Sequence, residues 1–271
     1  TIRDLYSREI DEILVEGEAG YRTAKDFMRM IMPSHAKVVQ AYTDTTPLFA
    51  RFQVESYLGG MFNPVVQLKS GGYIVIGVTE ALVAIDVNSG RATKEGSIED
   101  TALKTNLEAS QAIARQLRLR NLGGIVIVDF IDMVQAGHRD AVLAEFQKQL
   151  ARDRIKTSVN GFSALGLLEM TRKRTRESLA HQLCEPCSAC IGKGVVKTAR
   201  SIGYDILREI LREARQFNPK EFRVIASPKV IELFLDEESQ HLASLSDFIG
   251  KPISLQAEAA MAQEQYDIVL L

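Results

Sequence analysis

Short apolar runs in the middle of the chain predict a sheet with helices packed on it. Two runs rich in β-branched residues are separated by only two residues, which is typical of a hairpin. Leucine and isoleucine recur at helical spacing in two further segments. The predicted strands are 73–78, 81–86, 125–130 and 166–170, and the predicted helices are 101–119 and 138–153. This order predicts a mixed α/β sheet domain over residues 63–180.

The pattern is different on either side of this domain. Residues 1–62 have too few predicted elements to close a domain: strands at 10–15 and 37–41 and a helix at 21–31. Residues 181–197 carry all the cysteines and predict a hinge. A small α+β module fills 198–271, with predicted elements at 199–215, 222–226, 229–235, 253–256 and 266–270. The predicted fold class is therefore α/β, with mixed α+β parts.

The composition narrows the class of protein. Hydrophobic residues make up 46% and charged residues 25% of the 271 positions, which excludes a disordered or fibrous chain. No apolar run reaches the roughly 18 residues that a membrane span needs, so no transmembrane segment is expected. The chain has only three cysteines, all within seven residues, and cannot form a disulfide framework. This usage favours a cytoplasmic location and a metal site.

Charge is distributed unevenly along the chain. The net charge of −2 alone argues against a general nucleic-acid binder. However, residues 112–200 hold 15 Lys and Arg against 8 Asp and Glu, whereas residues 205–271 hold 7 against 12. This asymmetry favours a basic working surface joined to an acidic module, although local excesses also arise in chains of this length.

Two aspartates lie at the ends of predicted strands. Asp86 and Asp129 each follow an apolar run, and ligand sites in α/β sheets form at the carboxyl ends of strands. Asn88 shares the strand face of Asp86, whereas Asp132 points elsewhere if its strand continues. Two carboxylates and an amide oxygen suit magnesium, which can polarise a phosphoryl oxygen. The alternative is that the aspartates cap the following helix or turn.

A basic cluster follows the last predicted strand of the sheet domain, and a second group of arginines ends the helix at 101–119. The cluster comprises Arg172, Lys173, Arg174 and Arg176. The second group comprises Arg115, Arg118 and Arg120. Guanidinium groups near a magnesium site would suit a phosphodiester substrate. The second group also suits the dipole at a helix C-terminus, so a structural role stays open for it.

The cysteines form a short metal-binding knuckle. Cys184 and Cys187 are spaced as CxxC, a turn that presents two thiolates to one soft metal. His181 and Cys190 are the other candidate ligands, but four ligands this close rarely surround one ion. An iron–sulfur cluster would need a fourth cysteine, and a redox CxxC normally starts a helix. The simplest arrangement is one zinc shared by two chains, each contributing Cys184 and Cys187.

These motifs, in this order, resemble the RNase E/G family. The resemblance extends through essentially the whole chain, and several ordered motifs together are specific. Within the family, the length of the segment after the cysteines is more like the RNase E branch than the RNase G branch. The matching runs are 84–89, 105–109, 115–124, 129–133 and 166–172, followed by the CxxC.

The resemblance implies a magnesium-dependent endoribonuclease that cuts single-stranded RNA and leaves 5′-monophosphate and 3′-hydroxyl ends. It implies that Asp86 and Asp129 hold the catalytic metal and that Asn88 contacts the scissile phosphate. It also implies an RNase H-like part (1–62), a DNase I-like catalytic subdomain (63–180) and a zinc link (181–197). The tail (198–271) would pair zinc-linked dimers into a tetramer that acts in RNA processing and decay.

The chain also departs from the family pattern. The OB-fold domain and the 5′-end sensor of the family would precede Thr1, so we expect a part of a longer protein. Contacts with degradation-complex proteins would use regions outside this sequence. In the knuckle, Glu185 precedes the proline, and Cys190 is additional. An alternative function is a zinc-linked scaffold that binds RNA and oligomerises without catalysis, but such a scaffold would not need the two aspartates.

Overall fold

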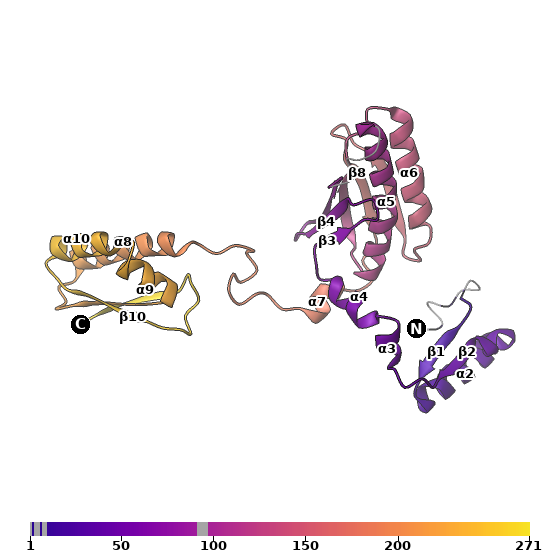
Figure 1. Cartoon of the computed structure of the whole chain (residues 1–271), viewed down its shortest axis with the longest axis horizontal. Helices are drawn as coiled ribbons and strands as arrows, with labels where there is room; N and C mark the ends of the chain where they lie inside the picture. The colour runs from indigo at the N-terminus through magenta and orange to yellow at the C-terminus, as the bar shows by residue number, and fades with distance from the viewer. Residues whose placement is uncertain (1, 3–5, 7–9, 91–96) are drawn as a thin grey trace. The chain divides into compact units, whose positions relative to one another are not determined.

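The structure is a computed structural model that describes residues 2, 6, 10–90 and 97–271. The chain folds as two compact units, residues 1–183 and 184–271 (Figure 1). The boundary falls just after helix α7 (Leu179–Leu183), so the predicted hinge at 181–197 begins inside a helix. In the described part of the chain, no helix is long and apolar enough to cross a membrane.

The first part of unit 1 is a small parallel βαβ arrangement. Its strands β1 and β2 pair in parallel, and Met28 and Val39 are fully buried in a hydrophobic cluster of their own. The elements are β1 (Ile13–Glu16), α2 (Glu18–Ile31), the 3-10 helix η1 (Pro33–Val38) and β2 (Val39–Tyr42). They confirm the predicted strands and helix with shifted ends. Two short helices absent from the prediction follow: α3 (Leu48–Arg51) and α4 (Val54–Gly60).

A six-stranded mixed sheet forms the main part of unit 1. The strand order is β3-β4-β5-β6-β8-β7, and β5 and β6 are its only parallel neighbours among the described residues. The strands are β3 (Val65–Gln67), β4 (Tyr73–Val78), β5 (Leu82–Asn88), β6 (Gly124–Asp129), β7 (Thr157–Phe162) and β8 (Leu168–Arg172). The four predicted strands and the hairpin are confirmed.

Two helices cover one face of this sheet. Figure 1 shows α5 (Ile98–Leu119) and α6 (Ala136–Leu150) side by side, and the two helices contact each other. Leu117 and Phe146 are completely buried against the sheet, and burial of such a side chain contributes about 1.5–3 kcal/mol. Alternate residues of β5 point toward the helices and are buried, whereas Ala84 and Asp86 are exposed on the other face.

The two edge strands, β3 and β7, were not predicted from the sequence. β3 has only three residues, and β7 has few apolar side chains. The pairing of β7 with β8 also shifts between Val159 and Gly161, and Gly161 has a φ of 97° that favours glycine. A polar, irregular edge strand therefore lacks the strict alternation on which the prediction depended.

Unit 2 is a smaller α+β fold. Its three strands have the order β10-β9-β11, with β10 parallel and β11 antiparallel to the central β9. The elements are α8 (Ala199–Gln216), β9 (Phe222–Ala226), α9 (Pro228–Leu235), α10 (Ser239–Ile249), β10 (Ile253–Ala257) and β11 (Tyr266–Leu270). All five predicted elements are confirmed, and α10 is the addition.

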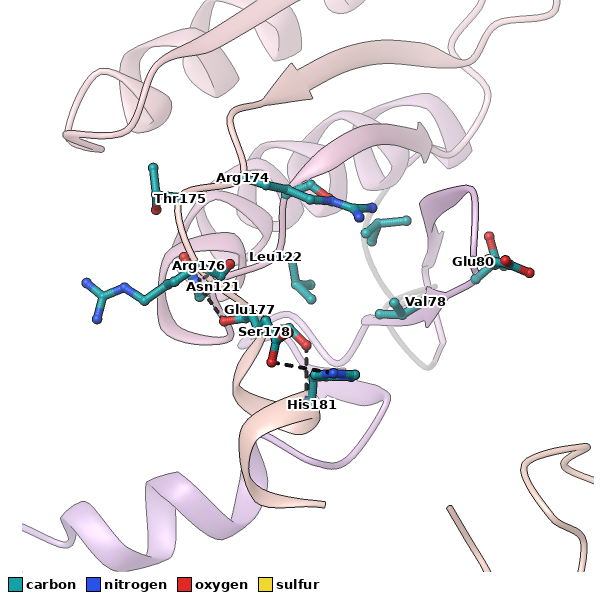
Figure 2. Close-up of a pocket in the computed structure, with 13 residues that line it drawn as sticks. Val78, Glu80, Asn121, Leu122, Arg174, Thr175, Arg176, Glu177, Ser178 and His181 are labelled. Carbon is teal, nitrogen blue, oxygen red and sulfur yellow. Dashed lines mark hydrogen bonds and ion pairs between the residues drawn. The ribbon is translucent and has the colours of Figure 1, made fainter. Parts of the chain in front are cut away.

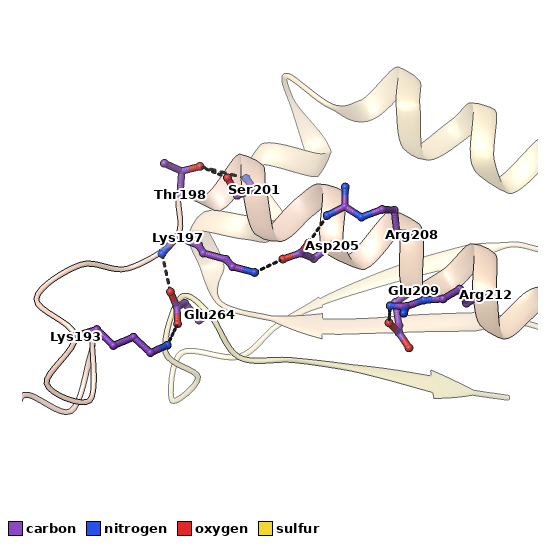
Figure 3. Close-up of polar contacts among 9 residues, drawn as sticks. All are labelled: Lys193, Lys197, Thr198, Ser201, Asp205, Arg208, Glu209, Arg212 and Glu264. Atoms are coloured by element: carbon purple, nitrogen blue, oxygen red, sulfur yellow. Dashed lines mark hydrogen bonds and ion pairs between the residues drawn. The ribbon is translucent and has the colours of Figure 1, made fainter.

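A chain of ion pairs ties the segment before α8 to the rest of unit 2 (Figure 3). Glu264 accepts hydrogen bonds from Lys193 Nζ at 3.1 Å and from the backbone N–H of Lys197 at 2.6 Å. Lys197 Nζ in turn lies 2.8 Å from Asp205 Oδ2, and Arg208 pairs with the same carboxylate. The hydrogen bond to Asp205 is the main cause that raises the pKa of Lys197. Exposed pairs like these contribute little individually, but together they give this segment defined contacts.

Candidate active site

The two strand-end aspartates are direct neighbours in the sheet. β5 and β6 are parallel, and their register places Asp86 opposite Asp129. Residues opposite each other on adjacent strands point to the same face, and both aspartates are exposed on the face that α5 and α6 leave uncovered. The structure therefore brings the two carboxylates together at the carboxyl ends of the central strands β5 and β6.

Asn88 completes this group. It lies two residues after Asp86 on the same strand face, and its Nδ2 donates a hydrogen bond of 2.8 Å to Asp86 Oδ2. The amide donor holds one carboxylate oxygen, which leaves the other oxygen of Asp86 available to a ligand.

The Asp129 carboxyl lies in a negative environment. Partial desolvation at the sheet, followed by the charges of Asp86 and Asp132, raises its pKa above the usual value. β6 ends at Asp129, so Asp132 does not continue the strand, and its charge acts on Asp129. Among the described residues, no lysine or arginine forms an ion pair with Asp86 or Asp129. A bound cation would relieve this repulsion.

The donor set fits a hydrated magnesium ion better than a fully enclosed metal. In the described ranges, no group of three or more His, Cys, Asp or Glu side chains is arranged to hold a metal ion. Two carboxylates are nevertheless a common protein contribution to magnesium, which keeps several waters and takes its other ligands from substrate phosphate. Asp86 and Asp129 therefore fit such an ion, and Asn88 supplies a neighbouring amide.

Gly72 allows the chain before β4 to pack closely against the end of β5 and against α5, behind this site. A Cβ atom at this position would lie 2.7 Å from the backbone oxygen of Asn88 and 2.8 Å from Thr105 Cγ2. Thr105 is fully buried on α5, so neither neighbour is the free end of a flexible side chain. The backbone at residue 72 can therefore pack against both the end of β5 and α5 only because this residue is glycine. No local sequence pattern indicates this contact, because it joins three separate segments of the chain.

The basic cluster lies at the opposite end of the sheet from the aspartates. β8 runs antiparallel to β6 and pairs Arg172 with Gly124, five residues before Asp129. At about 3.3 Å per strand residue, this corresponds to roughly 17 Å along the sheet. The expectation that the cluster flanks the two aspartates is wrong, because the direction of β8 carries the chain away from them.

Arg172 is a structural residue, which corrects its prediction as an RNA contact. It is 3% exposed, and its Nε lies 2.7 Å from Asp153 Oδ2 in a buried ion pair. Its Nη1 donates to the backbone oxygen of Leu122 at 2.8 Å. A guanidinium held in this way cannot reach a surface ligand. Arg120 is similarly buried, at 7% exposure, with its Nε bonded to Gln116 Oε1.

Lys173, Arg174 and Arg176 remain exposed. Arg174 Nε donates to the backbone oxygen of Gly123, and a Cβ on Gly124 would lie 2.9 Å from Arg174 Nη2. The Gly-Gly pair thus makes room for this guanidinium. Arg174 extends across a cavity of about 500 Å³, whereas Arg176 points away from it (Figure 2). Val78, Leu122 and His181 also line this cavity, which is distant from the aspartates.

Hydrogen bonds within the cysteine knuckle favour the thiolate form of Cys187. Hydrogen bonds from the backbone N–H groups of Cys190 and Ala189, and then from the Cys190 thiol, lower the pKa of Cys187. A more stable thiolate is a better ligand for zinc. All three cysteines are free, and Cys184 and Cys187 are exposed. Within the described residues these side chains do not form a complete metal site in one chain.

Comparison with known proteins covers almost the whole chain. The model of the Ribonuclease E/G family matches residues 1–175, and the model described as RNase E/G, Thioredoxin-like domain matches residues 186–270. Ribonuclease G of Escherichia coli (strain K12) is 46% identical over 270 residues, which is 100% of this chain and 55% of that protein. The chain thus spans about half the length of its Ribonuclease G relatives.

Ribonuclease E proteins match at lower identity. The Haemophilus influenzae protein (strain Rd) is 38% identical over 270 residues, which is 100% of this chain and 29% of that protein. The Escherichia coli (strain K12) protein is 40% identical over 237 residues, 87% of this chain and 22% of that protein. The expectation of greater likeness to the RNase E branch is therefore wrong, because tail length is a weaker signal than identity. Both sets of relatives, and both family models, show that the chain belongs to the ribonuclease E/G family.

Proposed function

We propose that this chain is the catalytic region of a magnesium-dependent endoribonuclease that hydrolyses single-stranded RNA to 5′-monophosphate and 3′-hydroxyl ends. The observation that carries the proposal is the register pairing of Asp86 with Asp129, with Asn88 beside them, in a member of this family. Two carboxylates that repel each other on an exposed sheet face lower the stability of the fold. Binding a metal ion for phosphate chemistry would explain why both are present. The proposed role is in RNA processing and decay in the cytoplasm.

Each site residue has a defined part in this proposal. Asp86 and Asp129 would hold magnesium, which when bound supplies charge stabilisation at the phosphate and lowers the pKa of a nucleophilic water. Asn88 orients Asp86 through its Nδ2 hydrogen bond, and on binding RNA its amide would face the scissile phosphate. Lys173, Arg174 and Arg176 would contact RNA phosphates distant from the cleavage point, because they lie at the other end of the sheet.

We also propose that two chains share one zinc ion. The hydrogen bonds that lower the pKa of Cys187 favour metal binding, and sharing would supply the ligands that the described residues of one chain do not bring together. Cys184 and Cys187 of each chain would make a four-thiolate site, which is a closed structural arrangement. Unit 2 would then pair zinc-linked dimers into a tetramer.

A magnesium assay tests the enzymatic proposal against the alternative of a zinc-linked scaffold. We expect the full chain to cleave a fluorescent single-stranded RNA with magnesium, and not with calcium at the same concentration. Calcium binds oxygen ligands but tolerates looser geometry, so it controls for RNA binding without efficient chemistry. RNA binding by gel shift with no cleavage in either metal would support the scaffold instead.

The close contact behind the site provides a second test. We expect Gly72→Ala to lower the cleavage rate about tenfold and stability by about 1–3 kcal/mol, since the added methyl must displace the end of β5. Gly137→Ala in α6 is the matched control, because a Cβ there meets nothing within 4 Å. Initial rates and thermal unfolding of both variants check this. Equal rates for Gly72→Ala and wild type would show that the close approach has no influence on the site.

A further inference from the structure

The backbone that follows Asp129 has no strand partner. β6 ends at Asp129, and its pairing with β8 ends one residue earlier, at Val128 opposite Leu168. Asp129 is therefore supported by the sheet on the β5 side alone. Beyond it, the chain enters the connection to α6, which starts at Ala136. The position of the Asp129 carboxylate thus depends on how this connection is held.

One side chain of α5 takes the place of the missing strand. Asn106 Nδ2 donates to the backbone oxygen of Ile131 at 2.8 Å, and Asn106 Oδ1 accepts from the backbone N–H of Ile131 at 3.0 Å. Both main-chain groups of one residue are satisfied by one amide, as a strand neighbour would satisfy them. Ile131 is only two residues beyond Asp129, so this pair of bonds fixes the backbone at the exit from the site.

The location of Asn106 argues against a role in packing alone. It is 0% exposed in the middle of a 22-residue helix, where asparagine is a poor helix former and leucine would pack well. A buried amide is tolerated when its polar atoms are bonded, and here both bond to the same connection. Asn106 therefore fixes the position of the connection after Asp129 rather than adding hydrophobic burial to the core.

A second residue of α5 holds the other end of the same connection. Glu99 accepts hydrogen bonds from the backbone N–H groups of Val134 at 3.3 Å and Gln135 at 3.1 Å. His138 Nδ1 lies 2.9 Å from the same carboxylate. Glu99 and Asn106 are seven residues apart, which places them two turns apart on one face of α5. The connection is thus attached to α5 at both ends.

We propose that Asn106 is a positioning residue of the active site, which holds Asp129 beside Asp86 by fixing the backbone of Ile131. The role rests on the proposed function, because it matters for a reaction that needs both carboxylates at one metal. Without Asn106, the end of β6 would be held by β5 alone, and the repulsion between the two carboxylates would move it away from β5. A small displacement of a catalytic group lowers the rate more than it lowers substrate binding.

Asn106→Leu removes both hydrogen bonds and keeps the number and branching of the side-chain heavy atoms. We expect hydrogen–deuterium exchange of residues 130–135 in the metal-free full chain to become about tenfold faster. We expect kcat to fall about tenfold with KM nearly unchanged, and Mn²⁺ binding measured by paramagnetic resonance to weaken by a similar factor. Asn106→Asp keeps an acceptor for the Ile131 N–H, so its kcat should lie between those of Asn106→Leu and wild type.

Ser110→Ala is the matched control. Ser110 is equally buried, one turn further along α5, and its hydroxyl bonds to the backbone oxygen of Asn106 within the helix at 2.9 Å. We expect it to leave exchange at 130–135, kcat and Mn²⁺ binding at wild-type values. An equal loss of kcat in Ser110→Ala, or full kcat in Asn106→Leu despite faster exchange, would overturn the positioning role.

Two further outcomes are decided by the same measurements. If Asn106→Leu does not fold, Asn106→Asp decides: unchanged exchange, kcat and Mn²⁺ binding in that variant would refute the role. If the wild-type chain shows no magnesium-dependent cleavage, the proposed function fails. The positioning role is then judged on Mn²⁺ binding, where equal affinity in Asn106→Leu and wild type would refute it independently.

Discussion

Replacing either Asp86 or Asp129 with asparagine is expected to lower RNA cleavage at least 100-fold and to leave the fold intact. Each change removes one of the two charges that would hold magnesium, and a loss of about 3 kcal/mol in transition-state stabilisation corresponds to this factor. Because the two carboxylates repel each other in the metal-free chain, either variant should also be at least as stable as wild type without metal. Single-turnover cleavage at saturating magnesium and thermal unfolding without magnesium measure the two effects.

Asp140→Asn is the control for this pair. Asp140 is exposed on α6, and the substitution makes the same change of one charge on the same unit. It should retain the wild-type rate. Wild-type cleavage by either Asp86→Asn or Asp129→Asn would remove the magnesium assignment, whereas an equal loss in all three variants would indicate a general effect of charge.

Cys187→Ser is expected to abolish zinc binding and to dissociate the zinc-linked dimer. Structural zinc sites bind with a free energy on the order of 10 kcal/mol, so their loss removes an obligate link. Cys190→Ser should retain the metal, because the backbone N–H groups of Ala189 and Cys190 still reach Cys187 and a serine hydroxyl can replace the thiol donor. Metal content per chain and molar mass from light scattering give both results, with one zinc per two chains expected for wild type.

His181→Ala completes the series. His181 lies in α7, where its Nε2 is 3.4 Å from Glu177 Oε2, and a four-thiolate site has no place for it. Zinc content and dimer mass should therefore stay at wild-type values. One zinc per chain that is lost in either His181→Ala or Cys190→Ser would mean that a single chain holds the ion.

The sequence predicted the elements that carry strong apolar patterns and failed where contacts are between distant segments. The runs ending at Asp86 and Asp129 identified two strands, and their polar ends identified the site. These two strand ends meet because β5 and β6 are parallel neighbours in the sheet. Local sequence patterns do not predict this strand order. The polar edge strand β7 lacked the alternation needed for a prediction. Helix α10, in contrast, carries Leu242, Leu245 and Ile249 at helical spacing, so its pattern was present in the sequence and was missed.

The arginines show the same limit at the level of side chains. Arg172 and Arg174 are two residues apart in a basic run, and their sequence context is nearly identical. One is buried against Asp153, 19 residues earlier, and the other lies on a surface cavity next to Gly123. Charge clustering could not separate a residue that stabilises the interior from one available to a ligand, because the partners are distant in sequence.

The parallel pairing of β5 and β6 also determines when the two carboxylates can first meet. The β4–β5 hairpin joins neighbouring segments, whereas Asp86 and Asp129 are 43 residues apart and are connected through the whole of α5. The entropic cost of closing this long loop comes before the free energy gained when β5 and β6 pair. Asp86 and Asp129 therefore come together later than the β4–β5 hairpin forms. On the ribosome, a growing chain that ends between β5 and β6 carries Asp86 but no partner for it. Such a chain also lacks Lys173, Arg174 and Arg176, so under the proposed function both the RNA contacts and cleavage must wait until β6 and β8 have emerged.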